Sequence, residues 1–281
     1  MAATTTTAGV QLSTLPTATG RAGLRGVLAS EFTKLRSVRS TYWTLAALFI
    51  VSVGVAAIAG IAITANIHTN PANKAGQDAT QASLIAFFEF GQLVIAVLGA
   101  LVITSEYSTG MIRTSLAVMP RRGVLYAAKA IVFAAVTLAI SLVASFVDFF
   151  VGQAILASKH YNTTLGQPGV LRAALLSAAI VTVFGLLAYG SGAIIRHTAG
   201  AITAILGVIF LIPALAQALP NSWYHAVVRW LPGGEALTPI ARSAPPLDHY
   251  LFSAWGEFAV FCGYTVVLLA LGAWLFIRRD A

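Results

Sequence analysis

Six apolar stretches, each about twenty residues or longer, dominate this chain of 281 residues. They lie near Tyr42–Ala65, Leu84–Thr104, Val124–Leu156, Val170–Ile195, Gly200–Leu219 and Trp255–Ile277. At about 1.5 Å of rise per residue, each is long enough to cross about 30 Å of hydrocarbon as an α-helix. None shows the alternation of a barrel strand, and helices satisfy their own backbone hydrogen bonds in lipid. The sequence therefore predicts an all-α membrane protein with six transmembrane helices.

Composition supports this prediction. Hydrophobic residues make up 58% of the chain and charged residues only 9%, against roughly 25% charged in soluble domains. An ordinary water-soluble globule is therefore excluded. The one cysteine, Cys262, cannot form an intramolecular disulfide, which excludes a disulfide-stapled fold. The third stretch is too long for a perpendicular span, so we expect it to tilt, kink or project beyond the lipid.

The N-terminal region divides into two parts. Residues 1–20, rich in Thr and Ala, predict a disordered tail, and residues 21–281 a single domain of six transmembrane helices. Apolar residues spaced by four and three between Leu24 and Val38, with basic residues between them, predict an amphipathic helix lying in the membrane surface. The alternative is a solvated helical lead-in to the first span.

The distribution of Lys and Arg predicts the orientation. With the N-terminus in the cytoplasm, twelve basic residues lie inside: Arg21, Arg25, Lys34, Arg36, Arg39, Arg113, Arg121, Arg122, Lys129, Arg196, Arg278 and Arg279. Five lie outside: Lys74, Lys159, Arg172, Arg229 and Arg242. This bias predicts a multi-pass protein of the plasma (inner) membrane with both termini cytoplasmic. The net charge of +8 is then explained by topology and by anionic lipid headgroups, and no nucleic acid partner is expected.

The segment from Pro220 to Tyr250 is too long for a simple connection. It combines aromatic residues such as Trp223 and Trp230 with prolines and glycines. This pattern at an outer boundary predicts short re-entrant or interfacial helices before the last span. An aromatic anchor belt with no role in transport is an equal alternative.

Familiar catalytic motifs are missing from the sequence. The phosphate-binding pattern G-x-x-x-x-G-K-[ST] does not occur, so we do not expect this chain to hydrolyse ATP alone. H-E-x-x-H, paired cysteines and G-x-S-x-G are also missing, and five histidines are scattered over loops and span ends. No metal site and no bound cofactor are expected.

The most informative stretch is Ser105–Arg122, reading SEYSTGMIRTSLAVMPRR between the second and third spans. Glu106 begins it, Tyr107, Met111, Thr114 and Val118 fall on one helical face, and Pro120 ends it. A charged amphipathic helix at the cytoplasmic surface can dock into a groove on a soluble partner. The alternative is an interfacial helix that caps the hairpin between two spans.

Two inner segments resemble the permease subunits of type-2 ABC exporters. Ser30-Glu31-Phe32 with Lys34, Leu35 and Arg36 resembles the signature before the first span of that family. The second segment resembles the loop that the family typically writes as E-Y-x-x-G-T-[IM]-[RK]; it contains Glu106-Tyr107, Gly110-Met111-Ile112-Arg113, Leu116, Pro120-Arg121-Arg122 and Lys129. Met111 takes the place usually held by Thr, a departure that alters hydrogen bonding there.

The resemblance implies an architecture and partners. It implies six helices per subunit, a second permease copy as a homodimer or related heterodimer, and a separate ABC ATPase that binds ATP and magnesium. Leu24–Arg39 is then similar to the surface connecting helix, with Glu31, Lys34 and Arg36 in it. Ser105–Met119 is similar to the cytoplasmic coupling helix, and the implied ATPase-coupling residues are Glu106, Tyr107, Gly110, Met111, Arg113, Pro120, Arg121 and Arg122.

Acidic residues within the spans are candidates for a transport pathway. A carboxylate at a helix centre costs about 2.5–3.5 kcal/mol on insertion scales, so it tends to face protein or water. Asp148 is the leading candidate, followed by Glu89 and Glu257, which lie near the outer ends of their spans on these boundaries. The function predicted is the transmembrane subunit of an ATP-driven exporter; a membrane anchor or assembly protein that moves no substrate is the alternative.

Overall fold

The protein is a bundle of long helices in the computed structural model, which describes residues 23–67, 79–220, 223–224, 231 and 254–279. The predicted tail at residues 1–20 and nearly all of the predicted outer helices between Pro220 and Tyr250 lie outside the described residues. The described part contains helices and no strand. In chain order the helices are α1 (Leu24–Ser37), α2 (Arg39–Ile67), α3 (Ala79–Ser108), α4 (Met111–Val118), α5 (Arg122–Ala157), α6 (Val170–Ile195), α7 (Thr198–Leu206), the π-helical segment η2 (Gly207–Leu211), α8 (Ile212–Ala216) and α11 (Ala254–Arg278).

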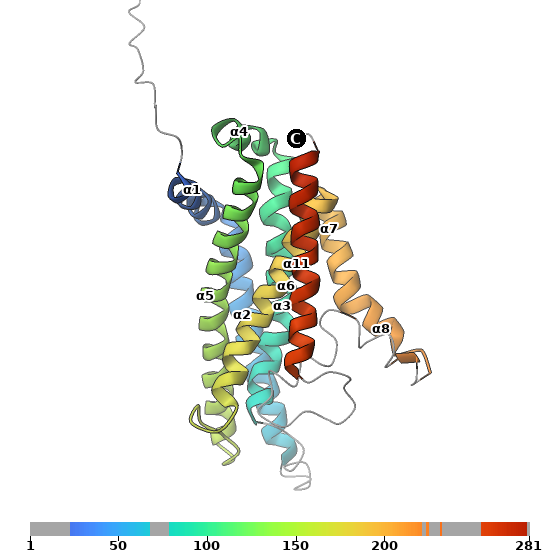
Figure 1. Cartoon of the computed structure of the whole chain (residues 1–281). Helices are drawn as coiled ribbons and strands as arrows, with labels where there is room; N and C mark the ends of the chain where they lie inside the picture. Colours follow the sequence, from blue (N-terminus) through green and yellow to red (C-terminus); the bar gives the residue numbers. More distant parts are fainter. Residues whose placement is uncertain (1–22, 68–78, 221–222, 225–230, 232–253, 280–281) are drawn as a thin grey trace, which may run out of the picture.

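Six helical segments in the described residues are long and apolar enough to cross a membrane. They are α2, α3, α5, α6, the continuous segment Thr198–Ala216 made of α7, η2 and α8, and α11. The prediction of an all-α fold with six spans is confirmed. Figure 1 shows α1, α4 and the C-terminal end of α11 at the same end of the bundle, hereafter the α4 end.

The core of the bundle is built on α3 and α6, the two most buried spans. Their backbones touch, because a Cβ added to Gly99 would lie 2.1 Å from the carbonyl oxygen of Gly185. Gly192 packs against Ile103 in the same way, and Gly190 faces the backbone of α11 at Leu268. In lipid, where apolar surface alone does not drive association, such small residues permit close van der Waals contact. Three glycines that could have served a dimer interface, Gly185, Gly190 and Gly192, are thus used within the chain.

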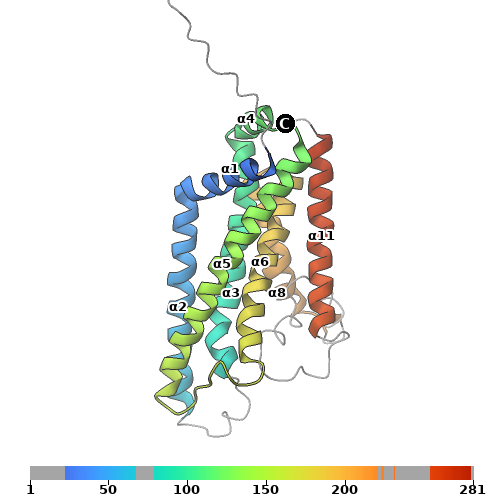
Figure 2. The same cartoon turned by 60° about the vertical axis from the view of Figure 1, so that its left-hand side comes forward.

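The long third span tilts. Its 36 residues extend about 54 Å, well beyond the hydrocarbon thickness of about 30 Å. Figure 2 shows α5 crossing the bundle diagonally, as expected for a helix that is too long to stand upright. Its first turns at the α4 end lie beside α1, so this end of α5 also contacts residues outside the spans.

The fifth crossing changes its helical form in the middle. Pro213 has no N–H and its ring excludes a regular bond to the carbonyl four residues earlier. The five residues Gly207–Leu211 just before it form the π-helical segment, a common response to such a disruption. Leu211 and Leu215 remain more than half exposed. Figure 1 shows α8 leaning away from the other spans at the end opposite α4.

The contact between Gly99 and Gly185 should be intolerant of any side chain. Replacing Gly99→Ala forces α3 and α6 apart because the new Cβ meets backbone, not a flexible side chain. We expect a lower unfolding temperature in detergent, with a cost of about 1–3 kcal/mol from overpacking. The control is Gly54→Ala on α2, where a Cβ meets nothing within 4 Å and helix propensity improves. Equal unfolding temperatures for the two variants would contradict this packing.

Candidate functional site

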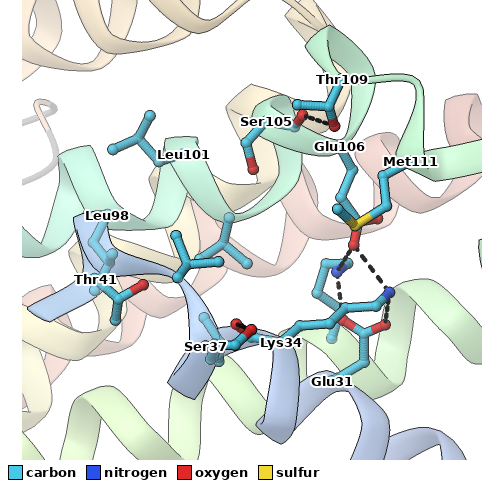
Figure 3. Close-up of a pocket in the computed structure, with 14 residues that line it drawn as sticks. Glu31, Lys34, Ser37, Thr41, Leu98, Leu101, Ser105, Glu106, Thr109 and Met111 are labelled. Atoms are coloured by element: carbon cyan, nitrogen blue, oxygen red, sulfur yellow. Dashed lines mark hydrogen bonds and ion pairs between the residues drawn. The ribbon is translucent and has the colours of Figure 1, made fainter.

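Four charged side chains meet at the α4 end between α1, α3 and α5. Glu31 and Lys34 come from α1, Glu106 from α3 and Lys129 from α5; we call these four residues the ion cluster. Lys129 Nζ donates to Glu106 Oε1 at 2.7 Å and forms a second, short ion pair with Glu31 Oε2. Lys34 Nζ lies 2.7 Å from Glu31 Oε1 and 3.1 Å from Glu106 Oε1. Each ammonium group therefore bridges both carboxylates, and Figure 3 shows Glu31, Lys34 and Glu106 pointing toward one another.

The ion cluster is buried and its formal charges balance. Glu31, Lys129 and Glu106 are 2%, 3% and 5% exposed. Removing such groups from water costs several kcal/mol per ion, and only close opposite charges and hydrogen bonds offset that cost. Three helices that are far apart in sequence are therefore held together by groups that cannot be separated without leaving a buried charge unpaired.

The positions of these residues in their helices explain why Glu106 and Lys129 need partners of opposite charge, whereas Lys34 is already favourably placed. Glu106 lies in the last turn of α3, where the helix dipole disfavours a negative charge. Lys129 is the one lysine of the apolar helix α5 and lies two turns from its start. Lys34 lies in the last turn of α1, where a cation is favourable.

Lys34 also connects the ion cluster to α4. Its Nζ donates to Ser115 Oγ at 2.9 Å. Burial alone would lower the pKa of Lys34, but the hydrogen bond and charge of Glu31, together with those of Glu106, more than offset this, so the pKa lies above its ordinary value. Lys34 therefore stays charged at neutral pH, and the link between α1 and α4 persists.

The apolar stripe of α1 faces the bundle only in part. Val27 and Glu31 are the buried residues of this helix, and Leu28 packs against the apolar cluster that contains Val27. Leu24 and Phe32 from the predicted apolar face are 58% and 49% exposed. Figure 2 shows α1 lying across the α4 end instead of along the spans. This geometry leaves Leu24 and Phe32 available to lipid, as expected of a helix in the membrane surface.

The predicted coupling helix is shorter than the sequence suggested. We expected one helix over Ser105–Met119, but Glu106 and Tyr107 belong to the last turn of α3, and α4 begins only at Met111. The chain breaks at Gly110, which has a φ of 69°. Glycine adopts this left-handed conformation without steric cost. The prediction that Glu106 and Tyr107 share a helix with Met111, Thr114 and Val118 is therefore wrong.

One side of the short helix α4 packs against the bundle, and the opposite side is exposed. Ile112 is buried against Met119 and Leu125, while Met111 and Val118 are 45% and 76% exposed. Arg113, Pro120 and Arg121 are exposed as well, as is Arg36 at the end of α1. Figure 1 shows α4 at the extreme end of the bundle. This position leaves its open side free for another molecule.

A second contact at the same end holds α11. Arg122 donates to the carbonyl oxygens of Arg279 at 2.8 Å and Ile277 at 3.3 Å, which satisfies groups at the C-terminal end of that helix. Arg196 lies 4.9 Å from the ring centroid of Tyr107, and Tyr107 in turn packs edge-on against Phe276. Arg122 and Tyr107, two of the predicted coupling residues, therefore bind other helices of the same chain.

Comparison with known families decides what kind of bundle this is. The sequence pattern of the family described as ABC-2 family transporter protein matches residues 27–214, which includes all four residues of the ion cluster. The chain belongs to the ABC-2 transporter family. It is accordingly a multi-pass membrane subunit of an ABC transporter. A comparison with curated proteins gives no match.

Two hollows flank the ion cluster of this ABC-2 subunit. One, of about 250 Å³, lies between α1, α2 and α3 and is lined by Glu31, Lys34, Glu106 and Lys129 together with apolar residues. Another, of about 440 Å³, lies between α1 and α4 and includes Val27, Ser115 and Met119. No group of three or more His, Cys, Asp or Glu in the described residues is placed to hold a metal ion.

The acidic pathway candidates lie apart from the ion cluster. Asp148 is fully buried in α5. Glu89 is exposed on α3 and accepts a hydrogen bond from Gln92 at 3.3 Å. Glu89 lies ten residues after the start of α3 at Ala79, about 15 Å along the helix. Glu257 belongs to α11, but its side chain lies outside the described part.

Sequence reasoning missed two residues of this site. Lys129 was part of the recognised motif but received no role, although a single lysine in a long apolar helix signals a buried partner. Ser115 gave no signal, because its contact with Lys34 joins residues 81 positions apart.

Breaking the ion cluster on one side should cost more than removing a matched pair. Lys129→Met leaves Glu31 and Glu106 with too few cations, and we expect a loss of about 3–5 kcal/mol in unfolding free energy. Combining it with Glu31→Gln restores the charge balance, so the double variant should be more stable than Lys129→Met alone. Denaturant unfolding in detergent measures both, with exposed Arg36→Ala as the control. A double variant that loses the sum of the two single losses would contradict mutual pairing.

Proposed function

We propose that this chain is the membrane subunit of an ATP-driven exporter, coupled to a separate ATPase that docks at the α4 end. The ion cluster is the observation that carries this proposal. It joins α1, α3 and α5, and through Ser115 also α4, so a force applied to α4 reaches two long spans directly. An assembly protein that moves no substrate has no need of such a connection.

The exposed side of α4 suits a docking helix. It combines apolar Met111 and Val118 with basic Arg113, and the neighbouring Arg121 adds a second positive charge. Gly110 and Pro120 lie just beyond the two ends of α4, so the helix is short and projects from the bundle. A short helix with apolar anchors inserts into a groove, while the flanking charges guide orientation and association.

Energy would come from the partner. ATP and magnesium bind to the ATPase, and closure of two ATPase subunits displaces the coupling helices of two permeases. Because ATP binds the closed state better than the open state, it shifts the equilibrium between inward- and outward-open forms. The permease then needs no catalytic residue of its own.

Charge supports the orientation. The α4 end carries Arg113, Arg121, Arg122, Arg196 and Arg278, and cytoplasmic loops are the ones enriched in such residues. We therefore place the α4 end in the cytoplasm and the protein in the plasma (inner) membrane. A second copy of the permease completes the unit, since six spans form half of the pathway that two ATPase subunits drive.

Docking through α4 can be tested without disturbing the ion cluster. We expect Arg113→Ala to weaken association with the ATPase and Val118→Asp to reduce it by about tenfold or more, because a charge replaces an apolar anchor. Co-purification and native mass spectrometry measure this; the unaltered complex should contain two permease and two ATPase subunits. Lys159→Ala, at the opposite end, is the control.

Transport itself requires reconstitution. In liposomes, ATP should drive substrate outward with the unaltered complex, and the α4 variants should hydrolyse ATP without matching transport. Full ATP-driven transport by Val118→Asp would contradict the role of α4. An intact complex that moves none of the compounds tested would favour the assembly protein.

Glu89 offers a test of the pathway. Glu89 is exposed on α3 about 15 Å from the start of the helix, and a carboxylate within a span is costly in contact with lipid. We therefore propose that it faces the water-filled pathway between two permeases. In a Cys262→Ala background, Glu89→Cys should react with an impermeant maleimide at least tenfold faster than Ile50→Cys, which is 73% exposed on an apolar face of α2.

The labelling experiment has an internal reference for orientation. Lys159→Cys lies in the connection between α5 and α6, and on the proposed orientation it is labelled from outside intact cells. If Glu89→Cys in the active complex reacts with the maleimide as slowly as Ile50→Cys does, Glu89 faces lipid or protein. Its proposed position in the water-filled pathway is then wrong.

A further inference from the structure

Asp148 is a buried carboxyl group with no partner. It is 0% exposed, and neither of its oxygens has a hydrogen-bond partner among the described residues. The hydroxyl of Ser52 on α2 lies against it. Asp148 lies nine residues before the end of α5 at Ala157, which is about 14 Å along the helix axis.

Two hydroxyl side chains on the same face of α5, Thr137 and Ser145, are paired, whereas Ser141 Oγ, like Asp148, has no hydrogen-bond partner among the described residues. Thr137 donates to the carbonyl oxygen of Phe133 at 2.7 Å, and Ser145 donates to that of Ala174 at 2.9 Å. The hydroxyl groups of Thr137 and Ser145 thus donate their hydrogen bonds to backbone carbonyl oxygens. Asp148, if ionised, could only accept; the hydroxyl of Ser52 is the donor beside it, while the backbone carbonyl oxygens of the surrounding helices are themselves acceptors.

No cation compensates for a charge at this position. The helices packed against this part of α5 are α2, α3 and α6; their ionisable side chains are Arg39 and Tyr42 of α2, Glu89, Glu106 and Tyr107 of α3, and Arg172 and Tyr189 of α6. In the described structure, none of them forms a hydrogen bond or an ion pair with Asp148. Helices α1 and α11 meet α5 near its start, and Lys129 of α5 is 19 residues away, about 29 Å along the helix.

The geometry points to Asp148 as a proton-binding site, occupied in this conformation. A neutral carboxylic acid can donate its O–H to Ser52 Oγ, whereas a bare carboxylate would be a buried charge with one hydroxyl group and no cation to compensate for it. The ligand is a single proton. Binding of this proton does not require a chain of ionisable groups that leads to Asp148.

Movement of α5 would open this site. Resting on the proposed function, displacement at Lys129 passes along α5, a continuous helix from Arg122 to Ala157, and shifts Asp148 relative to Ser52. Once water reaches the carboxyl group it ionises, so one proton is released for each opening of the α2–α5 contact. Protonation in the closed form does not depend on this second step.

Infrared spectroscopy of the full chain in lipid nanodiscs tests protonation directly. We expect a carboxylic acid carbonyl band that is lost in Asp148→Asn and kept in Glu89→Gln. In Ser52→Ala the band should remain but shift in frequency, since the facing hydroxyl is gone. Identical carboxylic acid bands in the unaltered chain and in Asp148→Asn would overturn the proposal.

Two further measurements keep the test decisive. If Asp148→Asn does not fold, aspartate labelled with ¹³C at its carboxyl group in the unaltered chain gives the same readout, and a spectrum without any ¹³C-sensitive acid band overturns the proposal.

Release on opening is tested on the ATPase complex trapped with ATP. The Asp148 band should fall by at least half; an unchanged band in a complex shown to have closed refutes release but leaves the function of α4 untouched.

Discussion

The buried pairing of two glutamates with two lysines is the interaction on which the α4 end depends. Each ammonium group of the ion cluster contacts both carboxylates, so no single contact can open without unbalancing the other three. Such an arrangement contributes little net stability compared with an apolar core, but it tolerates the loss of one member poorly. Its effect is to fix the relative position of α1, α3 and α5, which apolar side chains alone would allow to slide.

Packing in the bilayer imposes a second constraint, and it acts on different helices. Gly99 and Gly185 bring the backbones of α3 and α6 into contact, which leaves no space for one helix to move along the other. The π-helical segment and Pro213 in the fifth crossing have the opposite effect, since α8 leans away from the bundle. Rigid and adaptable parts are thus separated in space, with α3 and α6 as the fixed pair.

The spans were predictable because a bilayer demands about twenty apolar residues per crossing, and each expected boundary lies within a few residues of the structure. The helix at Leu24–Ser37 followed from periodicity, but its buried side did not, because Glu31 turns inward to pair with Lys129 of α5, which is 98 residues away in the sequence. The break at Gly110 was missed for a related reason: periodicity continues from Tyr107 to Met111 in the sequence, while the left-handed φ of one glycine ends the helix. Contacts between distant residues, such as Lys34 with Ser115, leave no local pattern to read.

The proposed coupling depends on these constraints. A force that an ATPase applied to α4 would meet the ion cluster first, and the cluster would pass it to α3 and α5. Because α3 is fixed to α6 through glycine, whereas α5 meets α2 through side chains, we expect α5 to move against α2 more readily than α3 moves against α6. The α2–α5 contact contains Asp148 and Ser52, a polar pair without a strong bond. A contact of this kind is easier to open than an ion pair or a backbone-to-backbone contact, so the proposed movement of α5 would separate Asp148 from Ser52 before it disturbed the ion cluster or the contact between α3 and α6.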